Sequence, residues 1–446
     1  MINHKELELL QAALKTLAEA YGELPDFSPG LDTKAAARVI DEVACRMRDN
    51  YPYFHPLYAG QMLKPPHPVA RIAYALSLWV NPNNHALDGG RASSALEVEC
   101  IGELGRMFSW EKPLGHLTGG GTMANLEALW VAGRLHPGKT IVASADAHYT
   151  HQRISEVLGL PFATIDTDAK GRMDVGELER RLLAGDVGTV VATTGTTGLG
   201  AVDPLPDILA LAQSHGARVH ADAAYGGYFT LASQLGADTR ASFDALADVD
   251  SIVIDPHKHG LQPYGCGCVL FRDPTVGRFY QHDSPYTYFS SAELHLGEIS
   301  LECSRPGAAA VALWATQQLL PYQEDGEFAH MLDDCLEAAR MLHTRLENGN
   351  RFVPLITPEL DIIVYAVRAD KASTASELAR RAFDAAAAKD LHLALINLPV
   401  DRVRARQADL VADAETVTCL RSVLMKPEHK DWVERIVTIL ESLPLD

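Results

Sequence analysis

A lysine beside a histidine ends a strand-like apolar segment in the middle of the chain. Lys258 stands in Ser251-Ile-Val-Ile-Asp-Pro-His-Lys-His-Gly260. A lysine at the end of a strand, among small residues, can lose its proton by partial desolvation, and its amine can then condense with an aldehyde. The alternative is a surface lysine where a strand runs into a loop, which an isolated Pro-His-Lys motif would favour.

A glycine-rich turn followed by a helix-forming segment predicts an anion site. Leu117-Thr-Gly-Gly-Gly-Thr122 runs into Met123-Ala-Asn-Leu-Glu-Ala-Leu-Trp130. Glycines let backbone N–H groups approach a phosphate, the Thr122 hydroxyl adds a donor, and the helix N-terminus carries partial positive charge. Neither GxGxxG after the first strand nor GxxxxGK[ST] is present, so the common nucleotide-binding loops fit poorly.

A single carboxylate follows a short, apolar, strand-like segment. Asp222 lies among alanines and glycines in Gly216-Ala-Arg-Val-His-Ala-Asp-Ala-Ala-Tyr-Gly-Gly227. Such a carboxylate is costly to bury unless it meets a cation, and the protonated ring nitrogen of pyridoxal phosphate is one. A helix cap or a structural ion pair is the alternative, although the Tyr-Gly-Gly that follows is typical of a turn. The imidazole of His148 could stack on such a ring. Aldehyde, phosphate and pyridinium sites together predict pyridoxal 5'-phosphate as cofactor.

With these motifs the chain resembles the group II pyridoxal-phosphate-dependent amino acid decarboxylases, the family of glutamate, aromatic amino acid and tyrosine decarboxylases. The resemblance covers most of the chain. The matching segments are Asn81-Pro-Asn83, Leu117–Thr122, Ala147-His148, Val191–Thr197, His220–Gly226, Asp255–Lys258, Tyr264–Gly267 and Cys303-Ser-Arg-Pro306. It implies the aspartate-aminotransferase-like fold type I of these enzymes.

The resemblance also implies roles for individual residues. Lys258 would form the Schiff base, Asp222 would hold the pyridinium nitrogen, and His148 would stack on the ring. The other implied cofactor contacts are Ala224 on the opposite face, Gly121, Thr122 and His257 at the phosphate, Thr197 near the ring hydroxyl, and Ser304 at the phosphate of the neighbouring subunit. The active unit would therefore be a homodimer with its active site at the subunit interface.

Three residues are candidates for substrate binding. Arg421 matches an arginine that binds the α-carboxylate in glutamate decarboxylases, and a planar guanidinium suits that task; the alternative is an ordinary arginine on an edge strand. Gln61 lies in the segment 58–62, which lines the substrate pocket in relatives. Tyr288 belongs to the loop 281–297, a candidate closing segment that also offers Tyr286 and His295.

Two positions depart from the family pattern. Met123 stands where many relatives have an acidic residue, and His259 replaces a large apolar or aromatic residue. We expect both side chains to lie next to the cofactor.

These parts predict decarboxylation of an L-amino acid to its amine and carbon dioxide, through a Schiff base on Lys258 and a quinonoid intermediate. The same cofactor also serves carbon–carbon lyases, aldehyde synthases and aminotransferases, and an inactive cofactor-binding homologue is a further alternative. Met62, His259 and the loop tyrosines would allow an aromatic substrate.

Composition supports a cytoplasmic enzyme. The formal net charge of −19 argues against nucleic acid or anionic membrane as partner. The seven cysteines have no framework spacing and are interpreted as reduced thiols. No signal segment is recognised at the start, no apolar run is long enough to span a bilayer, and no metal site is assigned.

Three regions must position these residues. With 446 residues the chain exceeds a single core. We expect a helical, dimer-embracing arm over 1–57, a large α/β domain with a mostly parallel sheet over 58–320, and a small α+β domain over 321–446. The expected elements include helices over 203–216, 331–348 and 430–443 and strands over 361–367 and 392–397.

Overall fold

The computed structural model describes residues 4–25, 27, 30–85, 89–281 and 300–445. Its larger sheet has seven strands in the order β1-β7-β6-β5-β4-β2-β3. They are β1 (Leu114–Thr118), β2 (Thr140–Ser144), β3 (Phe162–Ile165), β4 (Val187–Thr193), β5 (Arg218–Asp222), β6 (Ser251–Ile254) and β7 (Gly267–Phe271). Strands β3, β2, β4, β5 and β6 pair in parallel, whereas β7 is antiparallel to both of its neighbours. The prediction of a mostly parallel sheet is confirmed.

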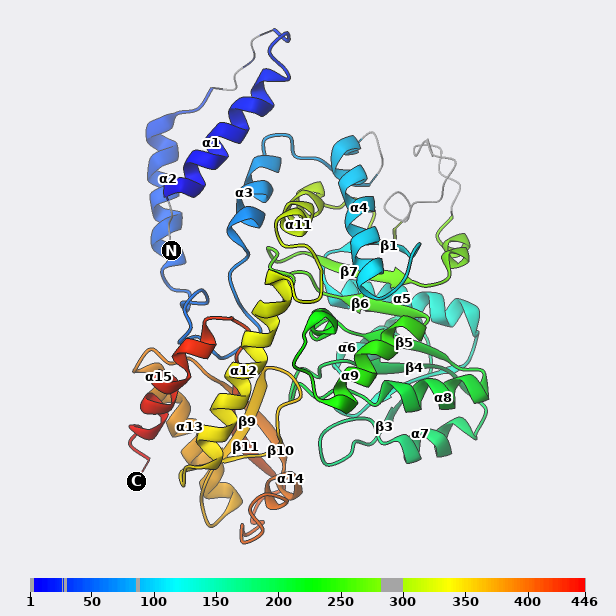
Figure 1. The fold of residues 1–446 in the computed structure, drawn as a ribbon, viewed down its shortest axis with the longest axis vertical. Coiled ribbons are helices and arrows are strands. Elements are labelled where there is room, and N and C mark those ends of the chain that lie inside the picture. Colours follow the sequence, from blue (N-terminus) through cyan, green and yellow to red (C-terminus); the bar gives the residue numbers. More distant parts are fainter. Residues whose placement is uncertain (1–3, 26, 28–29, 86–88, 282–299, 446) are drawn as a thin grey trace.

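Helices cover both faces of this sheet, which explains why β4 and β6 are buried along their whole length (Figure 1). Successive residues of one strand enter different cores: Val190 packs in one cluster and Val191 in another. The helices are α3 (Pro68–Ser77), α4 (Arg91–Met107), α5 (Gly121–Leu135), α6 (Thr150–Leu158), α7 (Val175–Leu182), α8 (Leu205–His215), α9 (Ala237–Asp244) and α11 (Gly307–Leu319). Helix α8 begins directly after Pro204 and is capped at its C-terminus by Gly216, whose φ of 66° lies in the left-handed region.

The carboxyl ends of the parallel strands share one edge of the sheet, where open α/β sheets bind ligands. Strand β5 ends at Asp222, and β6 is followed by the segment that carries Lys258. Strand β1, which has the same direction as β6, leads into the glycine-rich turn at the start of α5. The motifs separated in sequence therefore meet at this edge.

A second sheet of four antiparallel strands, β10-β11-β9-β8, lies toward the C-terminal part (Figure 1). Its strands are β8 (Phe352–Pro354), β9 (Ile362–Val367), β10 (Ala394–Pro399) and β11 (Thr416–Val423), with helices α12 (Glu327–Glu347), α13 (Ala372–Ala387), α14 (Val400–Arg404) and α15 (His429–Glu441). The helices and strands expected here are present with shifts of a few residues. Arg421 lies on β11, between β10 and β9, so the alternative of an edge strand is wrong.

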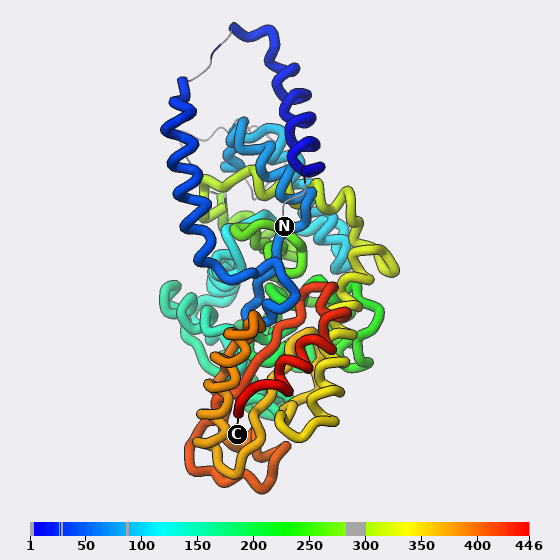
Figure 2. Tube along the Cα trace, turned by 90° about the vertical axis from the view of Figure 1, so that its left-hand side faces the viewer, coloured from blue at the N-terminus to red at the C-terminus, as the bar shows by residue number. Residues whose placement is uncertain are grey.

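Helices α1 (His4–Glu19) and α2 (Thr33–Met47) project from the body of the molecule (Figure 2). Neither contains a buried residue. An ion pair of 2.8 Å between Glu6 and Arg71 connects α1 to α3. Helix α2 exposes the apolar side chains of Val39, Ile40 and Val43. Among the described residues, no helix is both long and apolar enough to cross a membrane.

Candidate active site

A cavity of about 480 Å³ opens at the carboxyl edge of the large sheet. Its wall contains the following predicted cofactor residues: Gly121, Thr122, His148, Thr197, Asp222, Ala224, His257 and Lys258. They come from the ends of three strands, β4, β5 and β6, and from the starts of two helices, α5 and α6. The structure thus brings together in one cavity every predicted cofactor residue except Ser304.

The lysine of the cavity has a carboxylate beside it. Lys258 Nζ lies 3.1 Å from Asp255 Oδ2, and the Lys258 N–H donates to the Asp255 carbonyl at 2.9 Å. The side chain of Lys258 is 20 % exposed, whereas that of Asp255 is 4 % exposed. The turn after β6 therefore presents the amine to the cavity and keeps a negative charge next to it.

The glycine-rich turn is shaped for an anion. Gly120 has φ 152° and ψ 172°, a conformation that glycine adopts and other residues avoid, and no side chain caps the N-terminus of α5. A Cβ on Gly121 would lie 2.8 Å from Asp255 Oδ2, and one on Gly267 would lie 2.5 Å from the carbonyl carbon of Gly120. The glycines at these positions keep the start of the helix accessible, and its uncapped N-terminal end suits a phosphate.

Asp222 and His148 line the same cavity as the glycine-rich turn, so a ring whose phosphate lies at that turn would contact both side chains. Burial raises the pKa of Asp222, but the hydrogen bond and charge of His151 and the charge of Lys258 outweigh burial and place the pKa well below its ordinary value. The carboxylate is therefore ionised. Burial lowers the pKa of His148, so its imidazole is neutral near pH 7 and suits stacking on an aromatic ring.

Arg421 lies beside this cavity with its guanidinium buried. Its Nη1–H donates to the Thr197 carbonyl at 2.9 Å and its Nη2–H donates to Gln61 Oε1 at 2.7 Å. The residue is 6 % exposed, and among the described residues its Nε has no hydrogen-bond partner and no carboxylate pairs with it. Burial accordingly lowers its pKa from the ordinary value. A buried cation without an acid partner is a candidate binding group for a substrate carboxylate.

The remaining predicted residues are Ser304, the loop residues and Met123, and only Met123 is found in the cavity wall. Within the subunit, the Ser304 hydroxyl accepts a hydrogen bond from Asn83 Nδ2 at 3.1 Å and is not part of the cavity wall. Tyr288, Tyr286 and His295 fall outside the described residues. Met123 lines the cavity as expected.

The prediction that His259 lies next to the cofactor is wrong. Its side chain is fully buried, with Nε2 3.2 Å from Asp361 Oδ2, and its ring packs against those of Tyr225 and Phe229. The lysine and the following histidine point in different directions because the chain turns at this point. His259 thus packs against Tyr225, which lines the cavity, but does not line the cavity itself.

Several residues of the site were not identified from the sequence. Asp255 pairs with Lys258, and His151 lies 2.8 Å from Asp222. A signal for His151 is its spacing from His148, because residues three apart lie on one face of a helical turn. The other cavity residues that were missed are Asn125, Leu126, Thr150, Thr193, Gly195 and Tyr225.

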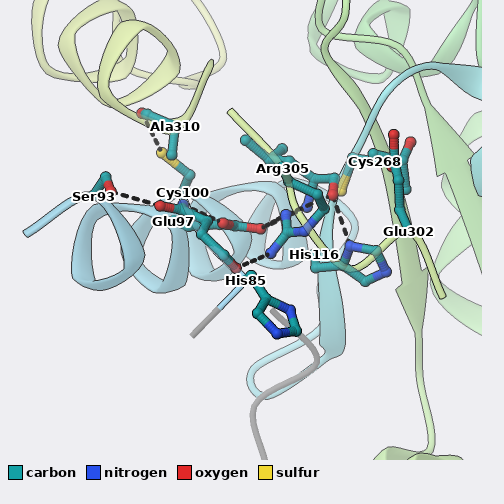
Figure 3. A network of polar contacts seen from close by, with 12 residues as sticks. His85, Ser93, Glu97, Cys100, His116, Cys268, Glu302, Arg305 and Ala310 are labelled. Carbon is teal, nitrogen blue, oxygen red and sulfur yellow. Dashed lines mark hydrogen bonds and ion pairs between the residues drawn. The ribbon is translucent and has the colours of Figure 1, made fainter. Parts of the chain in front are cut away.

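A buried polar network fixes the approach to the glycine-rich turn (Figure 3). Arg305 Nη1 donates to Glu97 Oε1 at 2.6 Å and to the Leu117 carbonyl at 2.7 Å. The other oxygen of Glu97 accepts from Asn84 Nδ2 at 2.6 Å. Nearby, Glu302 accepts the Gly119 N–H at 2.9 Å. This network holds the end of β1 immediately before the turn.

The donor set fits pyridoxal 5'-phosphate. The cavity offers an amine for an aldehyde, an ionised carboxylate for a pyridinium, a neutral imidazole for the ring face and an uncapped helix N-terminus for a phosphate. No group of three or more metal-ligating side chains occurs among the described residues.

The comparisons with known proteins agree with this fit. The pyridoxal-dependent decarboxylase conserved domain matches residues 52–368. A probable L-tyrosine/L-aspartate decarboxylase of Methanothermobacter thermautotrophicus is 33 % identical over 259 residues, which cover 57 % of this chain and 69 % of the relative. A probable L-aspartate decarboxylase of Archaeoglobus fulgidus is 27 % identical over 342 residues, covering 76 % of this chain and 88 % of the relative.

A solved structure shares the fold. The structure of Oryza sativa TDC with PLP and tryptamine superposes with a TM-score of 0.77 at 18 % identity, over 99 % of this chain and 97 % of that chain. At this identity the likeness concerns the fold alone.

Proposed function

The chain belongs to the pyridoxal-dependent decarboxylases and is a pyridoxal-phosphate-dependent amino acid decarboxylase, and we propose that the cavity at the carboxyl edge of its large sheet is the active site. In this proposal Lys258 binds the cofactor aldehyde and Asp222 its ring nitrogen. The other proposed cofactor residues are Gly121, Thr122, His148, Thr197, Ala224 and His257, with Ser304 acting in the neighbouring subunit.

The chain's own groups define the steps. The Lys258 amine would hold the cofactor aldehyde and give it up to the substrate amine, and the Asp255 carboxylate lies 3.1 Å from Lys258 Nζ. When bound, the cofactor supplies the electron sink for the bond that breaks. Asp222 keeps a negative charge opposite the ring nitrogen.

Orientation of the substrate selects decarboxylation, and Arg421 carries this part of the proposal. Its buried guanidinium donates to the Thr197 carbonyl, and Thr197 is itself in the cavity wall. An α-carboxylate bound there would be anchored to one side of the cavity. Gln61 holds the other end of the guanidinium, so the role expected for Gln61 becomes one of orienting Arg421. Tyr288 remains a proposed substrate contact.

Two substrates come first for testing, because the relatives carry the names of L-tyrosine and L-aspartate decarboxylases. Among the described residues, Lys258 is the one lysine or arginine in the cavity wall. A side-chain carboxylate would therefore lack a second cation there, whereas a phenol ring would not need one. This favours L-tyrosine, with L-aspartate as the second candidate.

The test is carbon dioxide release from the cofactor-loaded protein with a panel of L-amino acids, led by L-tyrosine and L-aspartate. Release from one of them, abolished by Lys258→Ala, is the expected result. If Lys258→Ala releases carbon dioxide as fast as the parent protein, the assignment of this cavity is wrong. Formation of a keto acid or an aldehyde in place of an amine would instead favour the aminotransferase or aldehyde synthase reaction.

The proposed active unit is a homodimer in which the arm over 1–57 embraces the partner. Support comes from α2, whose apolar side chains Val39, Ile40 and Val43 stay exposed in the part of the subunit that the structure describes. The division into 58–320 and 321–446 is supported by the two separate sheets. A cytoplasmic location is proposed because all seven cysteines are free thiols, which a reducing compartment maintains.

A further inference from the structure

His151 lies directly behind Asp222, on the side away from the cavity wall. Its Nε2 is 2.8 Å from Asp222 Oδ2, and the two side chains are 1 % and 6 % exposed. Asp222 lines the cavity and His151 does not. The contact joins the second residue of α6 to the last residue of β5, which are 71 positions apart.

The carboxylate is held at both oxygens. While Oδ2 faces His151, Oδ1 accepts the Ala224 N–H at 3.2 Å. A carboxylate has about four lone-pair positions, so two contacts leave it able to accept from a group inside the cavity. The two contacts also stop the carboxylate from rotating. Its orientation toward the cavity is therefore set before a cofactor binds.

The proton of this contact can be assigned from the acceptor. An ionised carboxylate can only accept hydrogen bonds, so the contact of 2.8 Å between Asp222 Oδ2 and His151 Nε2 requires a proton on Nε2. Among the described residues, the buried Nδ1 of His151 has no hydrogen-bond partner. His151 therefore donates from Nε2 to Asp222.

A second buried histidine shows that this contact is specific. His220 lies on β5 two residues before Asp222, but its Nε2 and Nδ1 are 2.8 Å and 2.9 Å from Asn125 Oδ1 and Ser251 Oγ. Both of its nitrogens are thus occupied. His151 is the histidine whose hydrogen-bonding capacity is directed at the cavity carboxylate.

We propose that His151 is a positioning residue for the reaction, because its Nε2–H holds the Asp222 carboxylate in the orientation that receives the ring N–H of the cofactor. This inference rests on the role proposed for Asp222. It assigns His151 a function that is distinct from packing, since the ring acts through one hydrogen bond to one oxygen atom.

The experiment compares three substitutions. His151→Gln places an N–H donor near the position of Nε2, His151→Asn has a donor that is too short to reach, and His151→Phe fills the space without a donor. His116→Phe is the matched control: His116 Nε2 lies 2.8 Å from Glu127 Oε2, both side chains are 0 % exposed, and the pair is not in the cavity wall. Each variant is loaded with pyridoxal phosphate and measured for absorption, cofactor release rate, kcat and KM.

We expect His151→Phe and His151→Asn to lower kcat about 10- to 100-fold, as loss of a hydrogen bond to a charged group does, with KM within about threefold. We also expect a shifted absorption maximum of the bound cofactor and faster cofactor release. His151→Gln should recover most of kcat and the parent spectrum. His116→Phe should lower thermal stability and leave kcat per bound cofactor unchanged.

Two results would overturn the inference. One is that His151→Phe has the same absorption spectrum and the same kcat as the parent protein. The other is an equal loss of kcat in His151→Gln and His151→Asn, if the melting temperatures show that both variants fold. Asp222→Asn separates this failure from that of the site itself: if it also retains full activity, the role of Asp222 is wrong, whereas if it is inactive while His151→Phe is normal, only the role of His151 is wrong.

Discussion

Arg421 Nη2 lies 2.7 Å from Gln61 Oε1, and this hydrogen bond joins the middle of the small sheet to the segment that follows the N-terminal arm. The same guanidinium reaches the Thr197 carbonyl at 2.9 Å, after strand β4 of the large sheet. One buried cation thus connects three segments at the border of the cavity. Because both contacts are to neutral oxygens, the positive charge remains available to a carboxylate.

Replacing Arg421 by Met should raise KM for the substrate by about 10- to 100-fold, because a charge-assisted hydrogen bond to the α-carboxylate is lost. Lysine should recover only part of the binding, since an ammonium cannot form a bidentate contact. Steady-state kinetics check this. Arg380→Met is the control, because Arg380 also contacts β11, through Thr418 Oγ1, but lies away from the cavity. An unchanged KM in Arg421→Met would contradict the assignment.

Gly121→Ala should abolish tight cofactor binding. The added Cβ would lie 2.8 Å from Asp255 Oδ2, so the glycine-rich turn at the start of α5 must distort. Fluorescence titration with pyridoxal phosphate should show an affinity at least about tenfold weaker. In Gly236→Ala the nearest atom to the new Cβ is 3.9 Å away, and this variant should bind like the parent. Equal affinities for the two variants would show that the phosphate binds elsewhere.

Glu97→Gln should lower the free energy of unfolding by about 3 kcal/mol, because it removes the carboxylate charge that lies 2.6 Å from the buried Arg305 guanidinium. Urea unfolding of the cofactor-free protein measures this. Glu103→Gln breaks an exposed ion pair with Arg106 and should cost less than about 0.5 kcal/mol. If both substitutions cost the same, the network before the glycine-rich turn does not stabilise the fold as described.

His220 should make the protein acid-sensitive. Burial, followed by the nearby His151, lowers its pKa to about 3. In the unfolded chain the pKa is near the ordinary 6.5, so between these values the unfolded state binds a proton that the folded state does not. The contribution of His220 to the free energy of unfolding is therefore fully present above pH 6.5. Below that pH it falls by about 1.4 kcal/mol per pH unit.

The measurement for His220 is urea unfolding of the parent and His220→Gln between pH 6.5 and 5. The variant should lose less stability over this range than the parent, by about 2 kcal/mol. His215→Gln, at the exposed end of α8, should follow the parent curve. Identical slopes for the parent and His220→Gln would contradict the buried, neutral state of His220.

The carboxyl-edge arrangement could be predicted from the sequence because parallel strands end on one edge, so Asp222 and the segments after β1 and β6 had to meet there. The position of Arg421 could not be predicted in the same way. A local apolar pattern indicates a strand but not its neighbours, and only the strand order places β11 between β10 and β9.

His151 and His259 show a second reason why sequence reasoning fell short. Their roles depend on which direction a side chain takes after a turn. The side chain of His259 contacts Asp361, the side chain of His151 contacts Asp222, and neither histidine lines the cavity. These are contacts between residues more than 70 positions apart, and the amino acids around each histidine carry no sign of the partner.

The most direct test of the account is to identify the lysine that binds the cofactor. The pyridoxal-phosphate-loaded protein is reduced with sodium borohydride, which converts the imine bond to a stable amine, and is then digested and mapped by mass spectrometry. We expect the pyridoxyl phosphate label on the peptide that contains Lys258, and no label in Lys258→Ala. A label on any other lysine, or bound cofactor that borohydride does not attach to the protein, would contradict this expectation.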